Sequence, residues 1–81
     1  MKSYNEIENE LALIISEVTG NSFDNISEKK FYEDMGFDSV SIIEMLVSIE
    51  ERYDINLGNE LMDSLHNCDK LINLIMEKAN N

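Results

Sequence analysis

The chain has 81 residues, 43% of them hydrophobic, which is enough for one small domain spanning residues 1–81. A core of that size rarely encloses a deep substrate cleft, and this argues against a conventional enzyme. Seventeen acidic and six basic side chains give a net charge of −11, which argues against binding to nucleic acid or anionic lipid and favours partners with basic patches.

The first predicted helix begins after Ser3 and runs to about Val18. Ser3 and Glu6 have the three-residue spacing of a capping box. Gly20 and Asn21 follow the helix, and both residue types tolerate the left-handed backbone at which helices commonly end. The apolar residues of the helix recur at helical intervals: Ile7, Leu11, Ile14 and Val18.

Residues 21–38 show no sustained period and predict a long loop. Phe31 and Met35 lie one helical turn apart, so we expect a short turn of helix before Gly36. Four apolar side chains of this segment are expected to attach it to the core: Phe23, Ile26, Phe31 and Met35.

The second main helix is predicted from Asp38, as its N-cap, through Tyr53. A rotation of about 100° per residue divides it into two faces. The wider face is expected to lie on the core: Ile42, Met45, Leu46, Ile49 and Tyr53. The other face begins at Ser39 and carries apolar side chains bordered by carboxylates: Val40, Ile43, Val47, Glu44, Glu50 and Glu51.

Two interpretations of this second face remain open. A small bundle packs each helix against two neighbours, so Ile43 in particular could be half-buried against another helix. Alternatively the face is a docking surface, on which the carboxylates attract a basic partner and the apolar side chains hold it.

The rest of the chain predicts one short helix and one main helix. Gly58 and Asn59 interrupt the chain, and residues 60–65 are long enough for a helical turn or two. Asn67 is expected to cap the last helix, and residues 79–81 are expected to be frayed. The apolar stripe of that helix is Cys68, Leu71, Ile72, Ile75 and Ala79. The predicted fold is therefore all-α, a small four-helix bundle of three main helices and one short helix.

Cysteine content and hydropathy favour the cytoplasm. Cys68 is the single cysteine, which excludes an intramolecular disulfide, and the polar N-terminal residues do not resemble a secretory signal. No apolar run approaches the roughly 20 residues that a membrane-spanning helix needs. We expect a cytoplasmic monomer that does not insert into a membrane.

Ser39 is the strongest candidate for a functional residue. Unpaired backbone N–H groups and the helix dipole favour a covalently attached phosphate at the start of a helix. A hydrolase is disfavoured because the Gly-x-Ser-x-Gly pattern is absent, and we interpret His66 and Cys68 as structural. Residues 34–38 lack the ligand spacing of a calcium loop, so we expect no dedicated metal site, although clustered carboxylates can bind divalent cations loosely.

Residues 31–40, Phe-Tyr-Glu-Asp-Met-Gly-Phe-Asp-Ser-Val, closely resemble the phosphopantetheine attachment segment of acyl carrier proteins. The resemblance covers nearly the whole chain. It implies that Ser39, beside Asp38, bears 4'-phosphopantetheine, which a separate magnesium-dependent phosphopantetheinyl transferase takes from coenzyme A. It also implies that Val40 and Val47 are apolar docking positions, and that the acidic docking positions are Glu44 and Glu51.

The same resemblance implies how such a protein works. The prosthetic thiol, not Cys68, holds acyl groups as thioesters, and acyl-loading and acyl-processing enzymes with basic docking patches exchange them. The protein itself catalyses nothing.

Departures from the family pattern leave the pathway open. Val40 and Ser41 stand where housekeeping fatty-acid carriers usually have leucine and an acidic residue, so a specialised, polyketide-like pathway is an equal alternative to fatty-acid biosynthesis. Peptidyl carriers usually show Gly-Gly-x-Ser, whereas Phe37 separates Gly36 from Asp38 here. Two further alternatives are a D-alanyl or aminoacyl carrier and an unmodified acidic interaction module.

Overall fold

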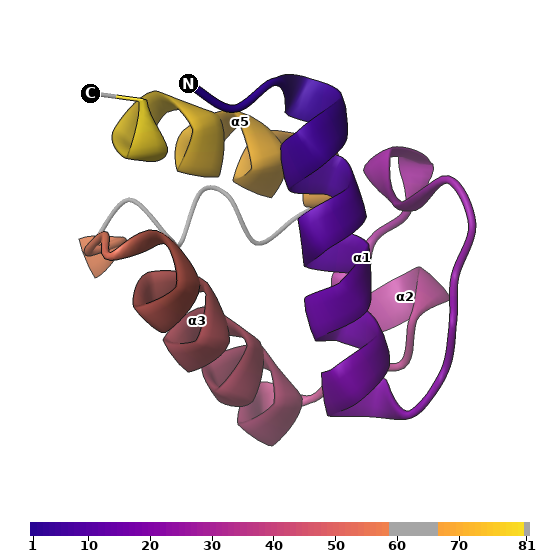
Figure 1. Cartoon of the computed structure of the whole chain (residues 1–81). Helices are drawn as coiled ribbons and strands as arrows, with labels where there is room; N and C mark the ends of the chain where they lie inside the picture. Colours follow the sequence, from indigo (N-terminus) through magenta and orange to yellow (C-terminus); the bar gives the residue numbers. More distant parts are fainter. Residues whose placement is uncertain (59–66, 81) are drawn as a thin grey trace.

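The computed structural model describes residues 1–58 and 67–80, and every regular element in these two segments is helical (Figure 1). The predicted all-α class is confirmed, whereas the short helix expected at residues 60–65 lies outside the described residues. In the described part of the chain, no helix is both long and apolar enough to cross a membrane. The elements are α1 (Tyr4–Thr19), the 3-10 turn η1 (Ile26–Glu28), α2 (Phe31–Asp34), α3 (Ser39–Tyr53) and α5 (Cys68–Ala79).

Helix α1 begins and ends at the residues that the sequence indicates. The Ser3 hydroxyl accepts a hydrogen bond from the Glu6 N–H, and the Glu6 carboxylate accepts one from the Ser3 N–H, each at 3.2 Å. Both halves of the capping box are therefore present. Gly20 ends the helix with φ of 76°, a left-handed conformation that glycine adopts without the steric cost of a Cβ atom.

The core lies between the three long helices. Helix α1 packs against both α3 and α5, and η1 packs against α5 (Figure 1). Burying one aliphatic side chain of this kind contributes about 1.5–3 kcal/mol, so the helices are held mainly by these contacts. The fully buried side chains include residues from each of them: Ile7, Leu11, Ile15, Met45, Ile49, Leu71, Ile72 and Ile75.

The loop between α1 and α3 is attached to the core, as the sequence predicts. Ile26, Phe31 and Met35 are buried and Phe23 is half-buried. The expected helical turn is α2, whereas η1 was not predicted. Phe37 is also buried, with its ring 5.2 Å from that of Phe31 in an edge-to-face arrangement.

The end of the chain differs from the prediction. Ala79 completes α5, and the Asn80 side chain accepts a hydrogen bond from the Lys2 N–H and donates one to the Lys2 carbonyl, both at 3.0 Å. The two ends of the described chain, at Lys2 and Asn80, therefore lie side by side (Figure 1). The prediction of a frayed tail is wrong for residues 79 and 80, because Ala79 belongs to α5 and Asn80 pairs with Lys2.

Candidate functional site

Ser39 is the first residue of α3, and the preceding loop determines its position. Gly36 makes the turn with φ of 70°, and the ring of Phe37 is buried in the core, which anchors the backbone just before Asp38. The Phe37 N–H also donates to the Phe31 carbonyl at 3.1 Å. The backbone before Asp38 is thus fixed, while the Ser39 side chain is exposed.

No hydrogen bond joins the Ser39 hydroxyl to any residue in segments 1–58 and 67–80. The hydroxyl stands at the N-terminal end of a 15-residue helix, where the helix dipole favours negative charge. An accessible, unengaged hydroxyl in that place suits the attachment of a phosphate-linked group.

Asp38 is the N-cap of α3, and it forms a reciprocal capping box with Ser41. The Ser41 N–H donates to Asp38 Oδ1 at 2.8 Å, and the Asp38 N–H donates to Ser41 Oγ at 3.0 Å. Hydrogen bonds from the Ser41 hydroxyl and N–H hold the pKa of the Asp38 carboxyl below its ordinary value, so Asp38 is charged at neutral pH. Ser41 was not predicted as part of the cap, although its three-residue spacing from Asp38 is a capping-box signal.

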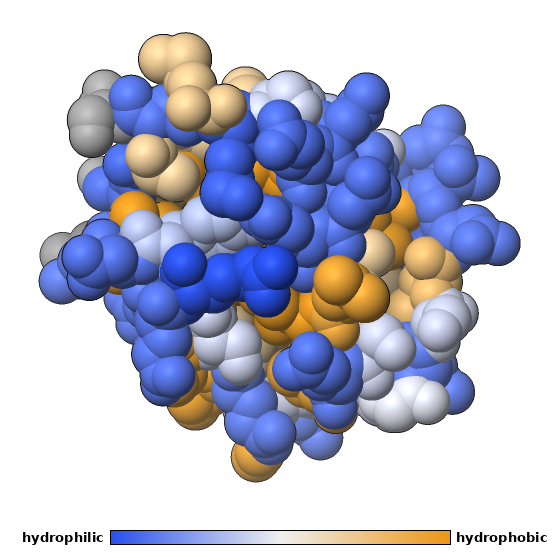
Figure 2. All heavy atoms as spheres, viewed as in Figure 1, coloured by the Kyte–Doolittle hydropathy of each residue, from blue (hydrophilic) through white to orange (hydrophobic). Residues whose placement is uncertain are grey.

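The apolar side chains of the second face of α3 are exposed. The exposed fraction is 64% for Val40, 60% for Ile43 and 46% for Val47. The structure therefore excludes the interpretation of Ile43 as half-buried. Apolar groups reach the surface along the α3 side of the molecule among hydrophilic ones (Figure 2).

The carboxylates around these side chains differ in their surroundings. Glu44 and Glu51 are exposed, and neither forms an ion pair with another described residue. Glu50 was predicted to border the same face, but it is half-buried and its carboxylate accepts a hydrogen bond from the Leu57 N–H at 3.0 Å. We therefore leave Glu50 out of the docking face, because it holds the turn that follows α3.

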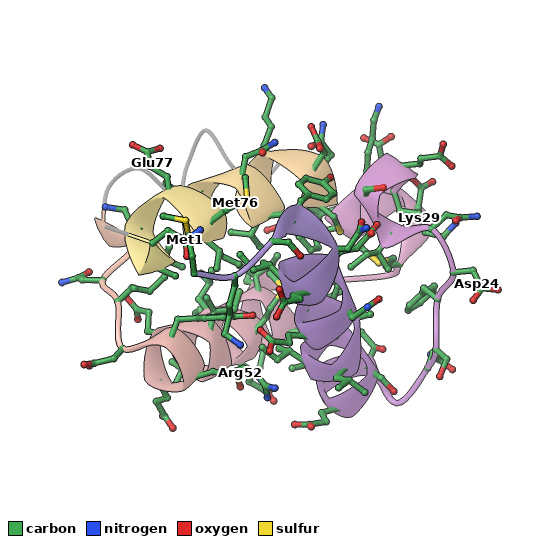
Figure 3. All side chains as sticks on the ribbon, turned by 45° about the horizontal axis from the view of Figure 1, so that its top comes forward. Met1, Asp24, Lys29, Arg52, Met76 and Glu77 are labelled. Carbon is green, nitrogen blue, oxygen red and sulfur yellow. The ribbon has the colours of Figure 1, made fainter. Side chains whose placement is uncertain are left out.

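Glu10 on α1 is a structural centre that the sequence did not reveal. Its carboxylate accepts from the Tyr53 hydroxyl at 2.5 Å and from Lys2 Nζ at 2.8 Å, and Arg52 lies 3.8 Å away. Figure 3 shows Arg52 on the side of α3 that faces α1. Burial opposes ionisation of Glu10, but these bonds and charges outweigh it and lower its pKa. Lys2 and Arg52, two of the six basic residues, are therefore paired with Glu10 rather than with Glu44 or Glu51.

Comparison with known proteins agrees with this geometry. The family model described as phosphopantetheine attachment site matches residues 9–75, which places the chain in the class of proteins that carry this prosthetic group. The acyl carrier protein of Kocuria rhizophila is 34% identical over 76 residues, which cover 93% of this chain and 94% of that protein. The chain belongs to the acyl carrier protein family.

Two other relatives show how far the similarity extends. The acyl carrier protein of Buchnera aphidicola subsp. Schizaphis graminum is 31% identical over 75 residues, 91% of this chain and 95% of that protein. The mitochondrial acyl carrier protein of Saccharomyces cerevisiae is 35% identical over 49 residues, 60% of this chain and 39% of that protein. The expected 4'-phosphopantetheine cofactor and the carrier role, in which the protein is not itself an enzyme, are thereby confirmed.

The residues at the start of α3 fit this cofactor. The Ser39 hydroxyl can take the phosphodiester, whose negative charge the helix dipole stabilises. When bound, the cofactor supplies a thiol on a flexible arm, which the chain's own cysteine cannot do. Cys68 has no exposed surface, and burial raises the pKa of its thiol to about 12.

Proposed function

We propose that Ser39 bears the 4'-phosphopantetheine, and that the protein carries acyl thioesters in the cytoplasm between enzymes of fatty-acid or of a specialised, polyketide-like biosynthesis. The observation that supports this assignment best is the exposed, unengaged Ser39 hydroxyl at the first position of α3, directly after the ionised Asp38. Within the matched segment, the loop anchored by Phe31 and Phe37 holds this position in place.

The α3 docking surface, which consists of Val40, Ile43, Glu44, Val47 and Glu51, is proposed to bind the phosphopantetheinyl transferase and the acyl-handling enzymes. Its apolar side chains are exposed, and its two carboxylates lie without described ion partners, so a basic patch with an apolar centre is complementary to it. The surface begins one residue after Ser39, so a partner docked on it reaches the prosthetic group. Short-lived contacts of this kind suit a monomer that visits several enzymes in turn.

The assignment of Ser39 is tested by locating the modification. We expect a broad-specificity phosphopantetheinyl transferase and a fluorescent coenzyme A to label the wild-type protein on the peptide that contains residue 39. Ser39→Ala should remain folded and unlabelled, because one exposed hydroxyl beside a helix cap contributes at most about 1 kcal/mol to stability.

Ser22→Ala is the matched control, since Ser22 is an exposed serine of the loop. It should be labelled like the wild type. Label on the Ser39→Ala protein, or on a different peptide of the wild type, would overturn the assignment and leave the unmodified interaction module as the better interpretation.

A further inference from the structure

The hydrogen bonds of Ser41 do more than cap α3. The Ser41 hydroxyl lies 2.6 Å from Asp38 Oδ1 and 3.4 Å from the Asp38 carbonyl oxygen. A hydroxyl has one proton, and the shorter contact to a charged acceptor is much the stronger hydrogen bond. The Ser41 proton is therefore donated to the Asp38 carboxylate.

These contacts fix the Asp38 side chain. Oδ1 receives both the hydroxyl and the N–H of Ser41, and the same Ser41 oxygen accepts the Asp38 N–H. Both groups that Ser41 donates end on the same carboxylate oxygen, Oδ1, and none on Oδ2. Asp38 itself is exposed, so an approaching protein meets an ionised carboxylate in one orientation.

The chemistry of loading brings cations to this carboxylate. When Ser39 Oγ attacks the pantetheine-linked phosphorus of coenzyme A, an O–P bond forms and the pyrophosphate P–O bond breaks. Adenosine 3',5'-bisphosphate leaves, and the serine proton passes to a base of the transferase. An enzyme that holds a pyrophosphate needs cationic groups around it, and at the moment of attack these groups surround Ser39. The Asp38 carboxylate, on the adjacent residue, is then within their reach.

We propose that Ser41 is a positioning residue for the loading of Ser39, because its hydroxyl holds the Asp38 carboxylate in the orientation that the cationic site of the transferase engages. The proposal rests on the assignment of Ser39 as the attachment site. The capping box needs the Ser41 N–H as a donor and the Ser41 oxygen as an acceptor, but it does not need the Ser41 proton to be donated to Asp38 Oδ1. The short hydroxyl contact is the additional feature, and it acts on the charged group nearest to the attachment site.

A double-mutant cycle tests whether Ser41 acts through Asp38. The rate of loading from coenzyme A is measured for the wild type, Ser41→Ala, Asp38→Asn and the double variant, below the unfolding temperature of each. Asparagine caps a helix about as well as aspartate, so Asp38→Asn removes the charge and keeps the cap. We expect Ser41→Ala to lower kcat/KM about fivefold in the wild-type background, mainly through KM, and less than twofold in the Asp38→Asn background.

Two variants of nearly equal shape separate the effect of the Ser41 hydroxyl on loading from the effect of side-chain packing. Ser41→Thr keeps the donor and should load within about twofold of the wild type, whereas Ser41→Val, of nearly the same shape but without a hydroxyl, should load like Ser41→Ala. Equal loading by the threonine and valine variants, or the same loss in both backgrounds of the cycle, would overturn the positioning role while leaving Ser39 as the attachment site. Failure of the wild type to load would overturn both proposals.

Discussion

At the scale of single residues, the site depends on which reactive groups are exposed. Ser39 is exposed at a helix start, whereas Cys68, the first residue of α5, is fully buried, and its N–H donates to the Lys29 carbonyl at 3.2 Å. The only thiol of the polypeptide is therefore kept away from acyl groups. A thioester has to form on the prosthetic arm.

Thiol titration checks this separation. At pH 8, which lies far below the pKa of about 12 of the buried Cys68 thiol, the folded unmodified protein should not react with an aromatic disulfide reagent. The pantetheinylated protein should show one reactive thiol. In denaturant, where Cys68 becomes accessible, the unmodified protein should show one reactive thiol and the pantetheinylated protein two. Rapid reaction of the folded unmodified protein would contradict the burial of Cys68.

At the scale of elements, α3 has one buried apolar face and one exposed apolar face. Ile42, Met45 and Ile49 are buried against the other helices, while Ile43 and Val47 face outward. The sequence predicts this division because a helix repeats about every 3.6 residues. It does not predict the position of Glu50, whose bond to the Leu57 N–H depends on how the chain turns after Asp54.

Substitution of Ile43 tests the apolar part of the α3 docking surface. We expect Ile43→Ser to raise the KM of loading about three- to tenfold. The substitution removes apolar contact area from the complex with the transferase and leaves the core of the carrier unchanged. Leu13→Ser on α1 is a close control, since Leu13 is 59% exposed and Ile43 60%. Equal effects of the two substitutions on KM would show that loading does not depend specifically on the α3 docking surface.

The carboxylates of α3 are tested by charge reversal. Glu44→Lys with Glu51→Lys should slow loading several-fold at low salt, and the deficit should shrink as ionic strength rises, because exposed charges are screened over about 10 Å at 0.1 M. Asp24→Lys with Glu77→Lys makes the same change in net charge at exposed positions away from α3 (Figure 3). A similar loss in this control pair would mean that overall charge, rather than the docking surface, governs recognition.

At the scale of the whole molecule, local signals were predictable and distant contacts were not. The caps at Ser3, Asp38 and Asn67 follow from the residue type at each helix start, and the structure confirms all three. The convergence of Lys2 and Tyr53 on Glu10 joins residues up to 43 positions apart, which no local pattern reveals. The burial of Phe37 likewise depends on where α2 places Phe31.

Net charge is also a property of the whole chain. A charge of −11 on a molecule with a radius of gyration of 11.4 Å repels itself strongly. Raising the ionic strength from about 0.02 M to about 0.2 M with sodium chloride should therefore raise Tm, because screening relieves repulsion that is stronger in the compact state. A Tm that stays constant or falls would show that the three described ion pairs outweigh the repulsion.

The central claim is that this carrier is loaded on Ser39, and the mass of the intact protein tests it most directly. The wild type and Ser39→Ala are incubated with coenzyme A, magnesium and a broad-specificity phosphopantetheinyl transferase. The account predicts a gain of one phosphopantetheine in the wild type and none in the variant. No gain in the wild type, or an equal gain in the variant, would contradict it.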